Sequence, residues 1–317
     1  GFSHARLSIR DITSGRQPIV RKISGYNYAI VYNGEIYNTE ELKNSLLGKG
    51  YVFETTTDTE VILCAYIQYG AQFVEKLNGI FAFAIWDGCR KKLFLFRDRV
   101  GVKPLFYSYE NGQLLFGSEP KALFCYPGFQ PELSMDGMRE ILSIGPARTP
   151  GCGIFSHVYE VRPGHYLLFD ENGKKDYTYW DLFRREHTDC YEQTVEKTSF
   201  LVKDAVKRQM VSDVPVCTFL SGGIDSSIVT AIACRYMEEH NETLNTFSFD
   251  FKDNDVYFKP NSFQPEQDVP YVNIMLEHYK TNHTYLLCDE KQLFSSLYAA
   301  VDAKDMPGMT DVDSSLL

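Results

Sequence analysis

A short stretch of the chain places two glycines, three hydroxyl side chains and a carboxylate in sequence. The residues are Ser221-Gly222-Gly223-Ile224-Asp225-Ser226-Ser227. The glycines allow the backbone to approach an anion, the hydroxyls donate hydrogen bonds, and the positive end of a following helix favours negative charge. Because a carboxylate does not suit bare phosphate, we expect Asp225 to hold Mg²⁺, which itself binds phosphate oxygens. The stretch predicts a phosphate site; the alternative is a tight strand-to-helix turn capped by serine.

A second group of residues could bind a free amino acid. An arginine such as Arg6 can pair with a carboxylate through two parallel hydrogen bonds, and the carboxylates Glu35 and Asp58 suit an ammonium group. The Asn33 side chain and the Gly34 backbone N–H could stabilise an oxyanion. Taken one by one, each of these residues is an ordinary surface group, and only their combination predicts a site.

The composition limits the classes of function. The chain has 317 residues and a formal net charge of −10, which suggests two domains and argues against binding to nucleic acid or to an anionic membrane. It contains no apolar run of the ~20 residues that a membrane helix needs, and it opens with no secretory signal. No two of its cysteines form a CxxC pair, so we expect free thiols in a cytoplasmic protein.

Strand and turn patterns dominate the first 180 residues. Residues 26–37 predict a strand, with Asn33-Gly34 as a turn signal inside it. Helices are expected over residues 39–47, with Thr39 as the N-cap, and over residues 57–77. Several short strands follow, with hairpin signals between them at Asp87-Gly88, Asn111-Gly112 and Asn172-Gly173. This half therefore predicts an antiparallel, β-rich domain.

The pattern changes after a polar linker at residues 181–192. Helices and strands then alternate, and this alternation predicts a parallel, doubly wound sheet. The helices are expected at 193–210, 226–239 and 269–279, and the strands at 215–220, 244–251 and 283–288. The phosphate loop, residues 221–227, would then follow the first of these strands, where open parallel sheets bind their ligands.

The phosphate loop resembles the pyrophosphate-binding loop of the PP-loop ATP pyrophosphatases, which split ATP into AMP and pyrophosphate while they adenylate a substrate. The resemblance implies ATP and Mg²⁺ as cofactors. It implies that the residues contacting pyrophosphate are Ser221, Gly222, Gly223, Asp225 and Ser226, with Asp225 as the Mg²⁺ ligand. By the same analogy, Phe219 and Phe249 would face the adenine.

The N-terminal group resembles the glutaminase domain of class II glutamine amidotransferases, which use an N-terminal nucleophile. Residues 97–107 and 117–123 resemble stretches found where this domain is joined to a PP-loop synthetase, which is the arrangement of the asparagine synthetase family. The resemblance implies an oxyanion hole formed by Asn33 and Gly34. The glutamine-binding residues that it implies are Arg6, Leu7, Ile9, Asn33, Gly34, Glu35 and Asp58. Residues 305–317 also resemble a part of the synthetase domain, without a definite role.

The implied fold is an α+β N-terminal-nucleophile glutaminase domain at residues 1–185, with layered antiparallel sheets and helices. An α/β doubly wound PP-loop synthetase domain would follow at residues 193–317. The implied enzyme is a ligase that amidates aspartate through β-aspartyl-AMP, uses ammonia from glutamine hydrolysis, and releases AMP and pyrophosphate. Its partners would be glutamine, aspartate and ATP, without nucleic acid or membrane, and the family suggests a homodimer.

The ends of the chain depart from the family pattern. The family nucleophile is a cysteine at the mature N-terminus, whereas this chain starts with Gly1 and none of its cysteines is N-terminal. We therefore expect a glutaminase domain that lacks its N-terminal segment, only the N-terminal part of the synthetase domain, and no glutaminase activity with these termini. Two alternatives stay open: an enzyme of the same architecture that resembles the β-lactam synthetases, and an inactive fragment with a binding function only.

Overall fold

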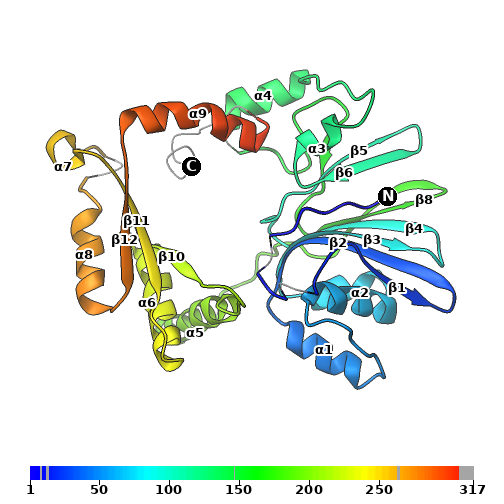
Figure 1. Cartoon of the computed structure of the whole chain (residues 1–317), viewed down its shortest axis with the longest axis horizontal. Helices are drawn as coiled ribbons and strands as arrows, with labels where there is room; N and C mark the ends of the chain where they lie inside the picture. Colours follow the sequence, from blue (N-terminus) through cyan, green and yellow to red (C-terminus); the bar gives the residue numbers. More distant parts are fainter. Residues whose placement is uncertain (8, 12–13, 146, 263–264, 307–317) are drawn as a thin grey trace. The chain divides into compact units, whose positions relative to one another are not determined.

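The structure is a computed structural model that describes residues 1–7, 9–11, 14–145, 147–262 and 265–306. Its contacts divide the described chain into two compact units. The first unit contains residues 1–185 together with residues 304–306, and the second contains residues 186–303 (Figure 1). The chain thus passes from the first unit to the second after Arg185 and returns to the first after Ala303.

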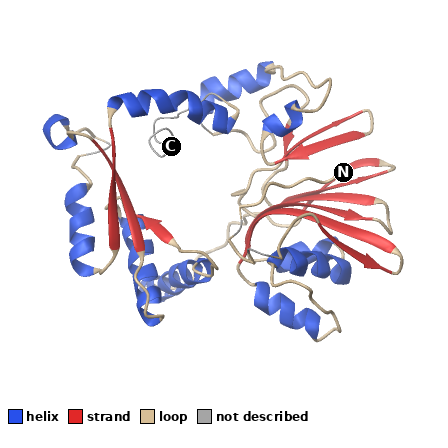
Figure 2. Ribbon diagram, viewed as in Figure 1, coloured by secondary structure: helices blue, strands red, loops and turns tan. Residues whose placement is uncertain are grey.

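Two antiparallel sheets form the β part of the first unit (Figure 2). The larger sheet has the strand order β1-β2-β3-β4-β8-β9. Its strands are β1 (Ile19–Ile23), β2 (Tyr26–Ile36), β3 (Gly79–Asp87), β4 (Lys92–Arg97), β8 (His165–Asp170) and β9 (Gly173–Thr178). The smaller sheet has the order β6-β5-β7, with strands β5 (Phe106–Glu110), β6 (Gln113–Gly117) and β7 (Tyr159–Glu160).

Alternating side chains of the larger sheet build two separate cores. Along β3, Phe81, Phe83 and Ile85 face one core, which also contains residues of α1 (Thr39–Leu47), α2 (Asp58–Tyr69) and the 3₁₀ helix η1 (Ala71–Lys76). Ala82 and Ala84 face the other core, which contains residues of the smaller sheet. Because successive side chains of a strand point to opposite faces, the helices and the smaller sheet lie on opposite sides of the larger sheet. This confirms the expected layers of antiparallel sheets and helices.

The turn expected at Asn33-Gly34 is wrong. Both residues lie inside β2, where Asn33 pairs with Ala82 and Gly34 with Phe81 of β3. The glycine is needed for close approach rather than for a turn, since a Cβ at position 34 would lie 2.2 Å from the carbonyl oxygen of Ile80. An Asn-Gly pair indicates a turn only where no neighbouring strand pairs with both residues.

Two helix expectations also need correction. The helix expected over residues 57–77 ends at Tyr69, because Gly70 adopts φ +67° and a separate 3₁₀ helix follows. The N-cap of α1 is Asn38 rather than Thr39. The Thr39 hydroxyl instead donates to the carbonyl of Ile36 at 2.6 Å, so it supports the end of β2.

The first unit continues with two short helices beyond the smaller sheet. These are α3 (Pro120–Phe124) and α4 (Met135–Ile144). A third apolar cluster lies beside them, formed by Phe106, Leu123, Ile154, Val158 and Met306. The last of these residues belongs to the segment that returns from the second unit.

Parallel strands and helices alternate in the second unit, as expected. The strands β10 (Cys217–Phe219), β11 (Asn245–Phe251) and β12 (Asn282–Cys288) form a parallel sheet in that order. The helices are α5 (Tyr191–Gln209), α6 (Ile224–Glu239), α7 (Asn254–Tyr257), α8 (Val269–His278) and α9 (Glu290–Lys304), which ends in the first unit. The α/β class predicted for this half is confirmed.

The two crossover helices of this sheet contact the same face. Thr218 of β10 hydrogen-bonds Thr230 of α6 at 2.9 Å, and the Tyr285 hydroxyl of β12 donates to Asn273 of α8 at 2.9 Å. The register places Thr218 beside Thr246 and Tyr285 beside Ser248, all on that face. No helix within the described ranges has the length and apolar character needed to cross a membrane.

Candidate functional site

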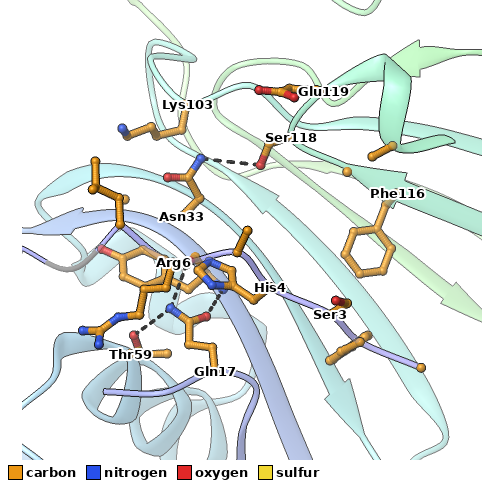
Figure 3. A pocket seen from close by; sticks show the side chains of 18 of the residues that line it. Ser3, His4, Arg6, Gln17, Asn33, Thr59, Lys103, Phe116, Ser118 and Glu119 are labelled. Atoms are coloured by element: carbon orange, nitrogen blue, oxygen red, sulfur yellow. Dashed lines mark hydrogen bonds between the residues drawn. The ribbon is translucent and has the colours of Figure 1, made fainter. Parts of the chain in front are cut away.

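A cavity of about 850 Å³ in the first unit brings the predicted amino-acid-binding residues together. It is lined by the N-terminal segment, by β2, by the start of α2 and by the stretch from β6 to Pro127 (Figure 3). The predicted residues in its lining are Arg6, Leu7, Ile9, Asn33, Gly34, Glu35 and Asp58. These residues come from three separate stretches of sequence, and only the fold places them around one space.

Beyond Ile30, β2 no longer pairs with β1, and this part of the strand exposes the Gly34 N–H to the cavity. The Gln17 side chain binds both backbone groups of Tyr32, at 2.6 Å to its N–H and 2.9 Å to its carbonyl, and Asp58 accepts from the Ile36 N–H at 3.2 Å. Backbone groups of a strand alternate between its two edges. The Gly34 N–H therefore points to the same edge, between the positions that Gln17 and Asp58 occupy, and it can donate to an oxyanion.

Asp58 is a buried carboxylate at the start of α2, with only 5% of its surface exposed. Its Oδ2 accepts hydrogen bonds from the Tyr32 hydroxyl at 2.9 Å and from the Ile36 N–H. Burial and the charge of Asp58 raise the pKa of Tyr32 well above its usual value, so the phenol remains a donor. Among the residues that the structure describes, no cationic side chain forms an ion pair with Asp58, so these hydrogen bonds hold its carboxylate in position.

Glu35 is half-buried on β2 beside this carboxylate. Burial, followed by the negative charge of Asp58, raises the pKa of Glu35 to about 7, although Arg10 and Lys103 act in the opposite direction. A carboxyl group whose pKa is raised by a neighbouring carboxylate lies in a negative electrostatic potential, which favours a cation. The ammonium group of an amino acid is a cation that suits such a pair.

Arg6 lies at the cavity with part of its guanidinium already engaged. Its Nη1 donates to the Asp11 carbonyl at 2.9 Å, and its Nη2 donates to the Arg10 carbonyl. Burial alone would raise the pKa of Asp11, but hydrogen bonds from Ser14 and Thr56 hold that pKa far below its usual range. The same hydrogen bonds anchor the segment that Arg6 contacts. A guanidinium has five N–H donors, so donors remain for a substrate carboxylate.

Asn33 and Leu7 occupy contrasting positions. The Asn33 side chain points into the cavity between Lys103 and Ser118, and its Nδ2 donates to the Ser118 hydroxyl at 3.5 Å (Figure 3). The Leu7 side chain, in contrast, is 90% exposed. The rim position of Leu7 suits a backbone contact better than a side-chain contact with a ligand.

Other lining residues were not predicted. Lys103, Ser118 and Glu119 lie within the stretches that carry the family resemblance, but nothing in their spacing links them to the Arg6 group. Cys125 also lines the cavity, on the stretch that follows α3. No regular spacing in the sequence reveals these residues, because they flank the strands of the smaller sheet and reach the cavity only through the packing of that sheet.

The phosphate loop of the second unit follows β10 directly and leads into α6. The N-cap of α6 is Gly223, which has no side chain that could cap the helix. The first N–H groups of α6 are therefore presented to the loop. The Ser221 and Ser226 hydroxyls lie 3.0 Å apart. Gly222, at φ +81°, packs so closely on α8 that a Cβ there would lie 2.8 Å from the Asp268 carbonyl oxygen.

This geometry fits an anion. A Cβ at Gly223 would meet only the Ser221 hydroxyl oxygen, at 3.5 Å, so the space in front of the helix end is open. Exposed N–H groups at a helix start, with two hydroxyls beside them, form the arrangement that binds phosphate groups. Asp225 lies in the first turn of α6 and is exposed.

The predicted adenine contacts lie near this loop. Phe219 ends β10 and pairs in register with Phe247, and Phe249 lies two residues further along β11 on the same face. The Phe219 side chain is 60% exposed. Within the described residues, no three His, Cys, Asp or Glu side chains gather as a metal cluster. A cation at Asp225 would therefore need phosphate oxygens and water as its other ligands.

Two family models match successive parts of the chain. The family described as "Glutamine amidotransferase domain" matches residues 1–180, and the family described as "Asparagine synthase" matches residues 198–317. "Asparagine synthetase [glutamine-hydrolyzing] 3" of Bacillus subtilis (strain 168) is 48% identical over 317 residues, which are 100% of this chain and 52% of the relative. "Asparagine synthetase [glutamine-hydrolyzing] 1" of the same organism is 36% identical over 80% of this chain and 39% of the relative.

A solved structure with low sequence identity also matches part of the chain. The glutamine phosphoribosylpyrophosphate amidotransferase of B. subtilis, complexed with ADP and GMP, matches 71% of this chain and 47% of that chain with 20% identity and a TM-score of 0.39. The chain spans about half the length of the first of the curated relatives. The match over residues 1–180 covers more than half of this chain. The chain therefore belongs to the glutamine amidotransferase domain family, with an asparagine synthase domain following in the same polypeptide.

Proposed function

We propose that this chain is part of a glutamine-hydrolysing asparagine synthetase. The first unit binds glutamine, from which ammonia is released, and the second unit binds the ATP that activates aspartate as β-aspartyl-AMP. Attack of ammonia on this mixed anhydride forms asparagine and releases AMP. The observation that carries the proposal is the cavity of the first unit, since it gathers Arg6, Asn33, Gly34, Glu35 and Asp58 around one space.

Each part of glutamine has a chemically matched partner in this cavity. The remaining donors of Arg6 bind the α-carboxylate, and the Glu35–Asp58 pair binds the α-ammonium group. The Gly34 N–H and the Asn33 Nδ2 donate to the side-chain carbonyl oxygen, where negative charge develops during hydrolysis. The buried position of Asp58 keeps its carboxylate fixed before the substrate arrives, which lowers the cost of ordering on binding.

The phosphate loop supplies the matching site for ATP. N–H groups of the first turn of α6 and the Ser221 and Ser226 hydroxyls bind the pyrophosphate part, and Phe219 and Phe249 lie on the face that receives the adenine. Asp225 holds Mg²⁺, which supplies positive charge against the pyrophosphate leaving group. The protein acts on soluble small molecules in the cytoplasm, and the family resemblance favours a homodimer.

The test uses the full-length protein of which this chain is a part, incubated with Mg-ATP, aspartate and either glutamine or ammonium. We expect asparagine, AMP and pyrophosphate in equal amounts, measured by chromatography. Asp225→Ala should abolish asparagine formation from either nitrogen source while glutamine binding persists. Asn33→Ala should impair the glutamine-dependent reaction only, since ammonium bypasses the first unit.

Two results would overturn the proposal. Adenylation of a different carboxylate without asparagine would favour the β-lactam-synthetase-like alternative. Failure of the chain to bind glutamine in equilibrium dialysis, at concentrations up to tens of millimolar, would remove the function assigned to the cavity.

A further inference from the structure

The segment that follows α9 completes the first unit. Asp305 and Met306 lie in the stretch that matches the asparagine synthase family, yet their contacts place them in the unit formed by residues 1–185. The Asp305 side chain is 7% exposed and Met306 is 9% exposed. Nothing in the proposed reaction uses either residue, so their burial needs another explanation.

Asp305 caps helix α3. The N-cap residue of this helix, Glu119, makes no side-chain capping bond. Asp305 lies 184 positions beyond Lys121 in the sequence. Its Oδ2 accepts from the Lys121 N–H at 2.8 Å, and its Oδ1 lies 3.2 Å from the Lys121 Nζ. A carboxylate that receives an orphan N–H in the first turn stabilises the start of a helix. The cap that α3 lacks locally is therefore supplied from the other end of the sequence.

Helix α3 and the residues before it form one wall of the cavity. Ser118, Glu119 and Ala122 all line the cavity, and the Ser118 hydroxyl accepts the hydrogen bond of Asn33. A displacement at the start of α3 would move these residues directly, because Glu119 and Ala122 flank the capped N–H of Lys121. Asp305 is thus linked to Asn33, the side chain assigned to the oxyanion hole, through the start of α3 and Ser118.

Met306 reaches the cavity by a second chain of contacts. It packs with Phe106 and Leu123, and the Arg148 Nη1 donates to its sulfur at 3.4 Å. The Arg148 Nη2 lies 3.3 Å from Glu160, which pairs with Arg97 at 2.9 Å.

The last contact of this chain is at the cavity itself. The Arg97 Nε donates to the carbonyl of Lys103 at 3.0 Å, and Lys103 lines the cavity. The two neighbouring residues of the returning segment therefore reach the cavity through separate sets of contacts.

We propose that Asp305 and Met306 are positioning residues for the glutamine cavity: they hold α3 and the Arg148–Glu160–Arg97 chain in place, so that the asparagine synthase stretch completes a wall of the amidotransferase site. This inference rests on the proposed binding of glutamine. It assigns a role to the start of the 305–317 stretch; residues 307–317 lie outside the described residues.

The test measures two quantities on the 317-residue chain: hydrogen exchange of the amides in residues 117–124, and the Kd for glutamine by equilibrium dialysis. For Asp305→Ala we expect faster exchange in this segment and a Kd raised about fivefold, the size expected from loss of a helix cap. Asp305→Asn keeps an acceptor for the Lys121 N–H, so it should restore the exchange rates and bring the Kd within about twofold of the original.

A matched control is Asp136→Ala. Asp136 lies in the first turn of α4 in the same unit, but its side chain is 85% exposed and forms an ion pair with the exposed side chain of Arg139. It should change neither quantity. If Asp305→Ala does not fold, Asp305→Glu replaces it, because the added methylene displaces the carboxylate, and we expect changes in the same directions.

The outcomes separate this inference from the proposed function. Unchanged exchange and unchanged Kd in the Asp305 variants would overturn the inference, as would equal effects of Asp305→Asn and Asp305→Ala. If the unchanged chain does not bind glutamine, the proposed function fails. Faster exchange confined to residues 117–124 would then still support the anchoring of α3, and unchanged exchange would overturn it.

Discussion

The phosphate loop occupies residues 221–227 of the second unit, whereas the cavity of the first unit draws on segments from Gly1 to Pro127. In the loop, neighbouring residues supply the hydroxyls, the carboxylate and the helix end. In the cavity, side chains that line the space also accept hydrogen bonds from backbone N–H groups. Asp58, for example, accepts from the Ile36 N–H of β2 while it presents a carboxylate to the cavity.

This difference teaches what a substitution can do in each place. A ligand-binding residue of an exposed loop can be removed with little effect on folding, because few buried groups depend on it. A buried cavity residue such as Asp58 cannot be removed in this way, because its loss leaves buried partners without hydrogen bonds. We expect the two sites to differ in whether binding and stability change together.

The largest effect should come from Asp58→Ala. Its removal leaves the Tyr32 hydroxyl and the Ile36 N–H without their acceptor, so the free energy of unfolding should fall by about 3 kcal/mol, and glutamine binding should be lost. Thermal unfolding and equilibrium dialysis measure both quantities. Asp58→Asn keeps an acceptor, so it should recover most of the stability but not the binding. Full binding by Asp58→Asn would contradict a role for the charge.

Asp225→Ala should separate binding from stability. ATP with Mg²⁺ at 100 times its Kd should stabilise the unchanged chain by about 2.7 kcal/mol, and the variant should lose this stabilisation. Since Asp225 is exposed, the Tm without ligand should not change. Differential scanning calorimetry with and without Mg-ATP measures the difference. The same ligand-induced shift in the variant would remove Asp225 from the site.

A pair of glycine substitutions compares the two sites directly. A Cβ at Gly34 would lie 2.2 Å from the Ile80 carbonyl oxygen, so Gly34→Ala should reduce the free energy of unfolding by about 2 kcal/mol. At Gly223, where only the Ser221 hydroxyl oxygen is near, the same change should cost less than about 0.5 kcal/mol. Urea denaturation measures both variants. Equal losses of stability would show that the two backbones are equally constrained.

The smallest expected effect is a pH dependence of the cavity. The pKa of Glu35 is raised to about 7, so the carboxyl is mainly neutral at pH 6 and mainly ionised at pH 8. The Kd for glutamine should therefore rise about tenfold as the pH falls from 8 to 6. Since the native state holds this proton more tightly, the contribution of Glu35 to stability decreases as the pH rises from 4.5 to about 7.

The control for this pH dependence is Glu35→Gln. It cannot titrate, so its Kd should be higher and nearly constant over the same range. A tenfold change that persists in this variant would assign the titration to another group, such as His4, whose pKa is lowered by burial.

Much of the fold was predictable from local signals. Apolar strands such as residues 92–97, and hairpin pairs such as Asp87-Gly88, indicate structure through the conformations that those residues prefer. The errors have tertiary causes. The Asn33-Gly34 pair lies inside a strand, where Gly34 allows the close approach of β3. The helix predicted over 57–77 ends early because Gly70 interrupts an apolar pattern that continues on both sides.

The sequence by itself determined the phosphate loop, since its donors, its carboxylate and the helix behind it are adjacent and need only local geometry to meet. It also indicated that Arg6, Asn33, Glu35 and Asp58 have the chemistry to bind an amino acid. Only the tertiary structure decided that Arg6, Gly34 and Asp58 surround one space, that Lys103 and Ser118 join them, and that Asp305 caps α3. The physical reason is that contacts between distant segments depend on sheet pairing and packing, which no local spacing encodes.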